Sequence, residues 1–301
     1  MAEKIVRNTE KKAAEPVKKA AEPAKKPAAA RKPQTVITPN KPTGGSTVGL
    51  RIGAVLLWIV AIVCEVFAIM AITKNFVIRF THNGDTNMWI AFIGFVVLDM
   101  AACITAAQLW KKANHIKPMS EKRGKFLFYL WNELGVIMAC ICFIPLIVLL
   151  LKSDKLDKKT KTIAAIIAAV ALLITGAASA DYHPISAEQK DEAESQINGD
   201  VYWTQFGHKY HLKYNGDPDA EQVAVDCPYI RESSSVYRGS VTEAIESGRT
   251  AICSYCAAHA ADWGINLNLA ELNVEGGTAS ENKDQVPVVN TTAAPTVTGG
   301  N

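Results

Sequence analysis

The feature that most constrains this chain is a set of four long apolar runs between residues 52 and 180. They are Ile52–Thr73, Met88–Trp110, Phe126–Leu151 and Ile163–Ala180. A helix rises about 1.5 Å per residue, so about 20 apolar residues cross the hydrocarbon of a bilayer. The sequence therefore predicts an all-α membrane bundle of four helices over residues 51–181, and it excludes a wholly soluble enzyme.

Charge is distributed unevenly along the chain. Residues 1–180 carry 25 Lys and Arg against 11 Asp and Glu, whereas residues 181–301 carry 7 against 18. Positive loops tend to stay in the cytoplasm, and the basic N-terminal region and the six basic residues in Lys111–Lys125 favour a cytoplasmic N-terminus. Five lysines in Lys152–Lys161 oppose this orientation. We expect a multi-pass protein of the cell membrane with both termini in the cytoplasm and the lipid bilayer as its first partner.

The two ends of the chain have the composition of disordered segments. Residues 1–50 repeat Lys, Ala, Glu and Pro with almost no large apolar side chain, which predicts a disordered basic arm. Such an arm is attracted to anionic lipid head groups, and nothing in it indicates a specific nucleic acid. Residues 182–200 are polar and predict a helical linker. Residues 264–301 are rich in Gly, Thr and Ser and predict a mostly disordered tail.

Three acidic residues, Glu65, Asp99 and Glu133, fall within the first three apolar runs. No Lys or Arg accompanies them there, and an ionised carboxylate at such depth is costly. One interpretation is a proton or cation path. The other is a set of hydrogen bonds between helices, to which Asn132 contributes. Four cysteines in the runs are expected to be small apolar packing residues: Cys64, Cys103, Cys140 and Cys142.

Residues 201–263 have the pattern of a small α+β module. Large and polar residues alternate in 201–204 and 209–213 around Gly207, which predicts a β-hairpin. Ser240 and Glu243 have the spacing of a capping box, so a short helix is expected to start there and to end at Gly248. A domain of this size buries too little surface to be stable without an additional cross-link, such as a metal ion or a disulfide.

Three cysteines and a histidine could provide such a cross-link by binding a metal ion. Cys253 and Cys256 form a Cys-x-x-Cys pair, and Cys227 with His211 would complete a tetrahedral shell for zinc. His208 and His259 are alternative fourth ligands. The module is therefore predicted to be stabilised by zinc at Cys227, Cys253, Cys256 and His211. A redox-active Cys253–Cys256 pair, free thiols and a disulfide are the alternatives.

The order of these residues resembles the short His/Cys modules found near the ends of bacterial membrane and secreted proteins. The likeness covers residues 201–256 and includes the Tyr210-His211 pair, Cys227-Pro-Tyr229 and the Cys253-Ser-Tyr-Cys256 step. It implies a metal site without an established activity. No resemblance to a known family is evident for the four apolar runs.

The function that these patterns favour is a membrane-anchored zinc-binding module that interacts with an unidentified protein or senses metal. The alternative is a small proton or cation transporter or channel that uses Glu65, Asp99 and Glu133. A membrane-tethered thiol oxidoreductase is a third possibility. No phosphate-binding loop, dinucleotide fingerprint, nucleophile elbow or zinc-protease motif occurs, so the sequence leans away from an enzyme.

Overall fold

A computed structural model describes residues 35–38, 46–75, 78, 81–212, 227–230 and 233–274. Most of the basic arm predicted over 1–50, the insertion over 213–226 and the tail beyond 274 lie outside these described residues. The helices and strands below are those of the described part of the chain.

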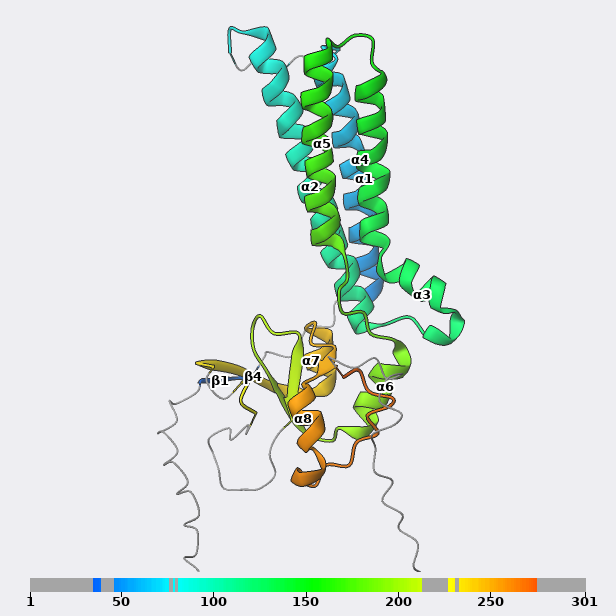
Figure 1. The fold of residues 1–301 in the computed structure, drawn as a ribbon, viewed down its shortest axis with the longest axis vertical. Helices are drawn as coiled ribbons and strands as arrows, with labels where there is room; N and C mark the ends of the chain where they lie inside the picture. The colour runs from blue at the N-terminus through cyan, green and yellow to red at the C-terminus, as the bar shows by residue number, and fades with distance from the viewer. Residues whose placement is uncertain are drawn as a thin grey trace, which may run out of the picture. The chain divides into compact units, whose positions relative to one another are not determined.

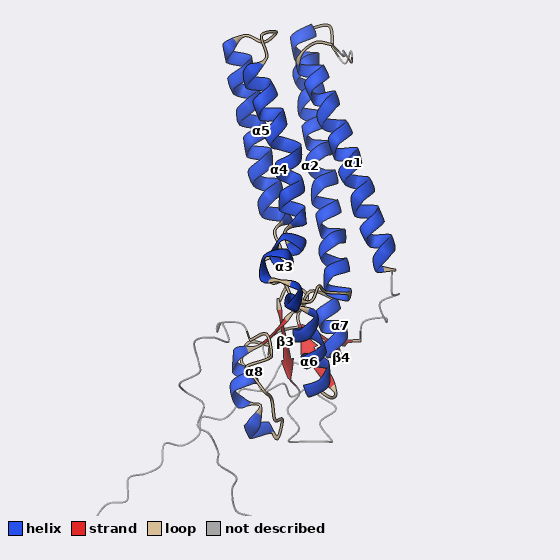
Figure 2. Ribbon diagram, turned by 90° about the vertical axis from the view of Figure 1, so that its right-hand side faces the viewer, coloured by secondary structure: helices blue, strands red, loops and turns tan. Residues whose placement is uncertain are grey.

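Four helices are long and apolar enough to cross a membrane, which confirms the predicted membrane bundle. They are α1 (Thr47–Ile72), α2 (Gly84–Ile116), α4 (Leu134–Lys152) and α5 (Lys158–Ser179). Figures 1 and 2 both show them packed side by side. Two of the helices start at a side-chain cap, because Asn83 accepts hydrogen bonds at the start of α2 and Asp157 at the start of α5.

Small side chains fill the contacts between these helices. Ala54, Ala61 and Ala68 on α1 are fully buried, and their spacing of seven residues places them on one face of the helix. Larger apolar residues such as Leu56 and Leu173 are more than half exposed. The bundle thus keeps its small residues inside, where helix backbones approach closely, and presents its large apolar side chains to lipid.

The third apolar run does not form the single helix predicted over Phe126–Leu151. It divides at Glu133 into α3 (Lys125–Asn132) and α4, and Figure 1 shows α3 turned away from the direction of α4. Hydrogen bonds from side chains on α2 stabilise the bend between α3 and α4. The Trp110 indole N–H donates to the Trp131 carbonyl at 3.0 Å, and the Asn114 amide donates to Asn132 at 3.2 Å.

The C-terminal module is built on a five-stranded sheet of order β1-β4-β2-β3-β5. The strands are β1 (Thr35–Ile37), β2 (Asp200–Trp203), β3 (Lys209–Leu212), β4 (Ser235–Ser240) and β5 (Ala251–Ile252). β2 and β3 pair antiparallel with Tyr202 opposite His211, which is the hairpin predicted around Gly207.

Short helices pack around this sheet. They are α6 (Ala187–Gln196), α7 (Val241–Glu246), α8 (Ser254–His259) and the 3-10 turn η2 (Ala261–Trp263), whereas the 3-10 turn η1 (Glu121–Arg123) lies between α2 and α3. The capping box predicted for Ser240 and Glu243 is present at the start of α7. Ser186 and Gln189 form a second one at the start of α6, within the segment predicted as a helical linker.

Two segments predicted as disordered contribute to the module. Thr35–Ile37, in the basic arm, pairs in parallel with β4. In the predicted tail, Leu272 is 3% exposed and Val274 bridges to Ile252. Both segments are short, so they are ordered by pairing with the sheet rather than by a core of their own. Because β1 precedes α1 and β4 follows α5, this pairing joins the segments on either side of the bundle in the sequence.

Candidate functional sites

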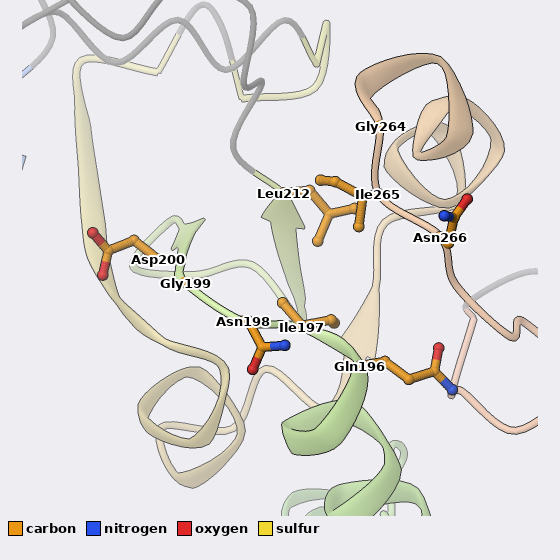
Figure 3. Close-up of a pocket in the computed structure, with 9 residues that line it drawn as sticks. All are labelled: Gln196, Ile197, Asn198, Gly199, Asp200, Leu212, Gly264, Ile265 and Asn266. Atoms are coloured by element: carbon orange, nitrogen blue, oxygen red, sulfur yellow. The ribbon is translucent and has the colours of Figure 1, made fainter.

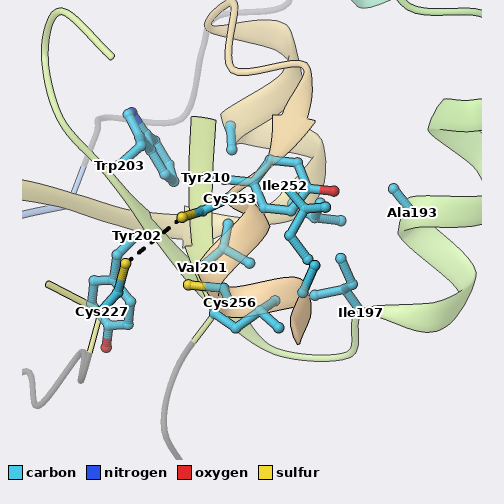
Figure 4. Close-up of a cluster of buried hydrophobic side chains, with 14 of the residues drawn as sticks. Ala193, Ile197, Val201, Tyr202, Trp203, Tyr210, Cys227, Ile252, Cys253 and Cys256 are labelled. Atoms are coloured by element: carbon cyan, nitrogen blue, oxygen red, sulfur yellow. Dashed lines mark hydrogen bonds between the residues drawn. The ribbon is translucent and has the colours of Figure 1, made fainter. Parts of the chain in front are cut away.

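The predicted His/Cys residues come together inside the module. His211 lies on β3, Cys227 follows the insertion after β3, Cys253 follows β5, and Cys256 lies in α8. Their ligand atoms are all within 4.8 Å of one another and all four residues are buried. Figure 4 shows the three sulfur atoms turned toward one another against Val201 and Tyr202. The hairpin and the Cys-x-x-Cys turn therefore bring distant parts of the sequence to one point.

The spacing of these atoms matches a tetrahedral metal shell. Zn–S bonds of about 2.3 Å separate two sulfur ligands by about 3.8 Å. Cys227 Sγ lies 3.7 Å from Cys253 Sγ, and Cys256 Sγ lies 3.8 Å from His211 Nδ1. Hydrogen bonds from the Cys227 and Cys256 thiols lower the pKa of Cys253. The donor set is suited to a borderline-soft cation.

The alternative ligands lie elsewhere. The His208 ring stacks on His183 with centroids 4.5 Å apart. The His259 ring stacks on Tyr255 at 4.1 Å, and its Nδ1 is 2.9 Å from the Tyr255 carbonyl oxygen. Neither histidine belongs to the cluster, so His211 is the histidine that the fold places with the three cysteines.

The intramembrane carboxylates divide into two places. Glu65 on α1 and Asp99 on α2 are both buried in the bundle. Glu133 instead lies at the corner between α3 and α4 and accepts a hydrogen bond from the Asp181 backbone N–H at 3.2 Å. The structure thus brings Glu65 and Asp99 together and leaves Glu133 at the end of the bundle.

The same bundle contains buried hydrogen-bond donors that the sequence did not single out. Arg51 Nε and Trp58 Nε1 on α1, and the hydroxyl groups of Thr175 and Ser179 on α5, are buried and find no partner within the described part of the chain. The Arg51 guanidinium lies over the ring of Trp110 at 5.6 Å and over that of Trp131 at 5.4 Å. Buried donors without acceptors are rare.

A junction between the bundle and the module was also missed by the sequence analysis. Lys190 of α6 donates to the Ile116 carbonyl at the end of α2 at 2.8 Å, and it lies 3.2 Å from Glu246 of α7. His115 Nε2 lies 3.5 Å from Asp181 Oδ2. Lys190 and Glu246 are 56 positions apart in the sequence, and the other two pairs are separated by 66 or more. Only the tertiary fold brings them together.

A cavity of about 270 Å³ lies beside α6 and β2, and Figure 3 shows the residues that line it. Its lining is mainly amide and aliphatic, with Gln196, Asn198 and Asn266 among the polar groups. Its one acid, Asp200, already accepts a hydrogen bond from Arg238 at 2.6 Å. The cavity therefore has no free charged group among its lining residues and is a poorer candidate than the two buried clusters.

Comparison with protein families matches residues 37–206 to the model of SLAC1, described as voltage-dependent anion channel. The match takes in all four membrane helices, α6 and β2. It ends before His211, so no family match supports the resemblance of residues 201–256 to bacterial His/Cys modules. No curated protein and no solved structure matches the chain.

Proposed function

Because this chain belongs to the SLAC1 voltage-dependent anion channel family, we propose that it conducts anions across the membrane. The observation that carries the proposal is the family match, which spans more than half of the chain and includes all four membrane helices. The sequence suggested a proton or cation transporter or channel as the alternative function. The family match supports a channel, and it favours anions over cations as the conducted ions.

The charges at the two ends of the bundle support anion conduction. Five lysines lie in Lys152–Lys161, at the α4–α5 connection, and six basic residues lie in Lys111–Lys125, at the opposite ends of these helices. Rings and clusters of Lys and Arg raise the local concentration of anions and favour their entry. On this proposal the lysines of the α4–α5 connection attract anions, which accounts for their departure from the positive-inside rule.

Inside the bundle, Arg51 is the group best placed to receive an anion. Its guanidinium lies against the adjacent rings of Trp110 and Trp131, its Nη2 donates to the Lys117 carbonyl at 3.3 Å, and its Nε–H lacks an acceptor in the described residues. Trp58 lies seven residues further along α1, so its unpaired indole N–H falls on the same helix face about two turns deeper. These donors form the start of a route for an anion.

Deeper in the bundle the route is closed in this conformation. Phe92, Phe143 and Leu146 are fully buried in the shared core, and small residues fill the remaining contacts. Conduction therefore requires the helices to separate, as in other gated channels where apolar constrictions exclude water.

Anion efflux from liposomes that contain the full-length protein tests this function. We expect chloride efflux above that of empty liposomes, and a several-fold lower efflux for Arg51→Gln, because the variant loses the charge that receives the anion. Lys74→Gln is the matched control, since Lys74 is exposed, lies outside both basic clusters, pairs with Asp85 at 2.8 Å and should affect efflux little. Chloride efflux equal to that of empty liposomes, or Arg51→Gln efflux equal to the wild-type value, would contradict the proposal.

We further propose that His211, Cys227, Cys253 and Cys256 bind a structural Zn²⁺ ion. The specific support is the convergence of their ligand atoms within 4.8 Å in a module that otherwise has a small core. An ion at this point would fasten β3, β5 and α8 to the segment after the insertion. This role is structural, because four protein ligands leave no open position for a substrate.

A chelator experiment on the full-length protein tests the zinc proposal. Removal of the metal should increase amide hydrogen exchange in β3 and α8, because the lost cross-link lies in the module. Cys256→Ala should reproduce this increase, whereas Cys140→Ala, in α4, should not. Equal exchange in the module with and without metal would contradict the proposal.

A further inference from the structure

A second group of metal-ligating side chains lies within the membrane bundle. Asp99 and Cys103 are four residues apart on α2, so they share one face of the helix, and Cys142 of α4 faces them. Cys103 Sγ lies 3.6 Å from Asp99 Oδ1 and 3.7 Å from Cys142 Sγ. The three ligand atoms are all within 4.8 Å of one another.

The environment of Asp99 points to a missing partner. Its side chain is fully buried, and its Oδ2 atom has no hydrogen-bond partner in the part of the chain that the structure describes. The thiol of Cys103 reaches only the other oxygen of the carboxyl group. An unsatisfied carboxylate oxygen in hydrocarbon needs a proton or a cation.

The geometry and chemistry of the group suit a cation of the same kind as the one proposed for the module. The separation of the two sulfur atoms is close to the edge of a tetrahedral shell with Zn–S bonds of about 2.3 Å. Asp99, Cys103 and Cys142 supply three ligand atoms, and Glu65 of α1, another buried carboxylate of the bundle, is not part of this group. Mixed thiolate and carboxylate ligands favour Zn²⁺ over harder ions such as Mg²⁺.

We propose that Asp99, Cys103 and Cys142 bind Zn²⁺ inside the membrane bundle. Both thiols lose their protons on binding, so the two thiolates balance the two charges of the ion, and the Asp99 carboxylate leaves the site with one net negative charge. The ion would join α2 to α4 and give the buried carboxylate its missing partner. The cysteines expected to serve only as packing residues acquire a specific role.

Titration of the metal-free, full-length protein with Cd²⁺ tests this site, because Cd²⁺ bound by thiolates absorbs in the ultraviolet. We expect two equivalents for the wild type and one for the double variant Cys103→Ala/Cys142→Ala. The matched double variant Cys64→Ala/Cys140→Ala changes the two other cysteines of the bundle and should retain two. A wild-type protein that binds one equivalent, lost only on Cys253→Ala/Cys256→Ala, would overturn the bundle site and leave the module site standing.

X-ray absorption of the zinc-loaded wild type gives an answer even if the double variant does not fold. Two occupied sites predict an average of about 2.5 sulfur ligands per zinc, because the bundle offers two and the module three. An average of about three with one zinc per chain would overturn the proposal. Mass spectrometry of the unreduced protein should find Cys103 and Cys142 free, and a disulfide between them would also overturn it.

Discussion

At the scale of single residues, close helix contact depends on the absence of a side chain at Gly135. A Cβ atom at this position would lie 2.7 Å from Ala107 Cβ and 3.2 Å from the Ser179 carbonyl oxygen. Gly135 is thus the point at which α4 meets both α2 and α5. The nearby glycine of α5, Gly176, has nothing within 4 Å of the corresponding position.

We expect Gly135→Ala to destabilise the bundle by about 1–3 kcal/mol, since the new methyl group must displace backbone rather than a flexible side chain. Gly176→Ala should be neutral or slightly stabilising, because alanine is the better helix former and has room there. Thermal unfolding of both variants in the same detergent measures the difference. Equal unfolding midpoints for the two variants would show that α4 does not approach α2 this closely.

At the scale of elements, the end of α2 meets the segment between α5 and α6 through titratable groups. Burial acts to raise the pKa of Asp181, but the hydrogen bond and charge of His115 outweigh it and hold that pKa below its ordinary value. Burial and the charge of the stacked His208 lower the pKa of His183, although Asp181 partly opposes them. His183 also accepts, through its carbonyl oxygen, a hydrogen bond from the Thr250 hydroxyl at 2.9 Å.

These shifts predict that acid weakens the junction. A group with a lowered pKa in the folded state stabilises the fold above its ordinary pKa and loses that contribution as pH falls. For His183 the loss begins near pH 6.5, and for Asp181 it begins only near pH 4. The unfolding midpoint should therefore drop between pH 7.5 and 5.5, and His183→Gln should reduce this drop. His82→Gln, in the exposed α1–α2 loop, is the matched control. An unchanged drop in His183→Gln would rule out His183 as its source.

The elements also show which parts of the fold the sequence could reveal. Length and hydropathy predicted the four membrane helices, because crossing a bilayer imposes both. The division of the third run at Glu133 was missed, since it depends on Trp110 and Asn114 of α2, which are distant in sequence. The strand Thr35–Ile37 was missed for a similar reason, because its order comes from pairing with β4.

The sites were predictable to different degrees. The Cys-x-x-Cys spacing indicated the module cluster, and the fold places His211 there rather than His208 or His259. The bundle cluster was not predicted, because cysteines in an apolar run look like packing residues until Cys142 is seen opposite Cys103. Unpaired donors such as Arg51 Nε carry no signal in the sequence, since a missing partner is a property of the tertiary structure.

At the scale of the whole molecule, one membrane bundle carries two kinds of charged group with opposite consequences. Basic residues at its ends and unpaired donors at Arg51 and Trp58 favour anions. Glu65 and Asp99 in the interior would favour cations unless they are neutralised. The match to the SLAC1 family is the observation on which the proposal of anion conduction rests.

Ion selectivity of the full-length protein in a planar bilayer is the most direct test. Under a gradient of potassium chloride, an anion-conducting protein gives a reversal potential close to the equilibrium potential of chloride, and we predict this result. Replacement of chloride by a large organic anion should then reduce the current, while replacement of potassium should not. A reversal potential close to that of potassium would contradict anion conduction and restore the path through Glu65 and Asp99.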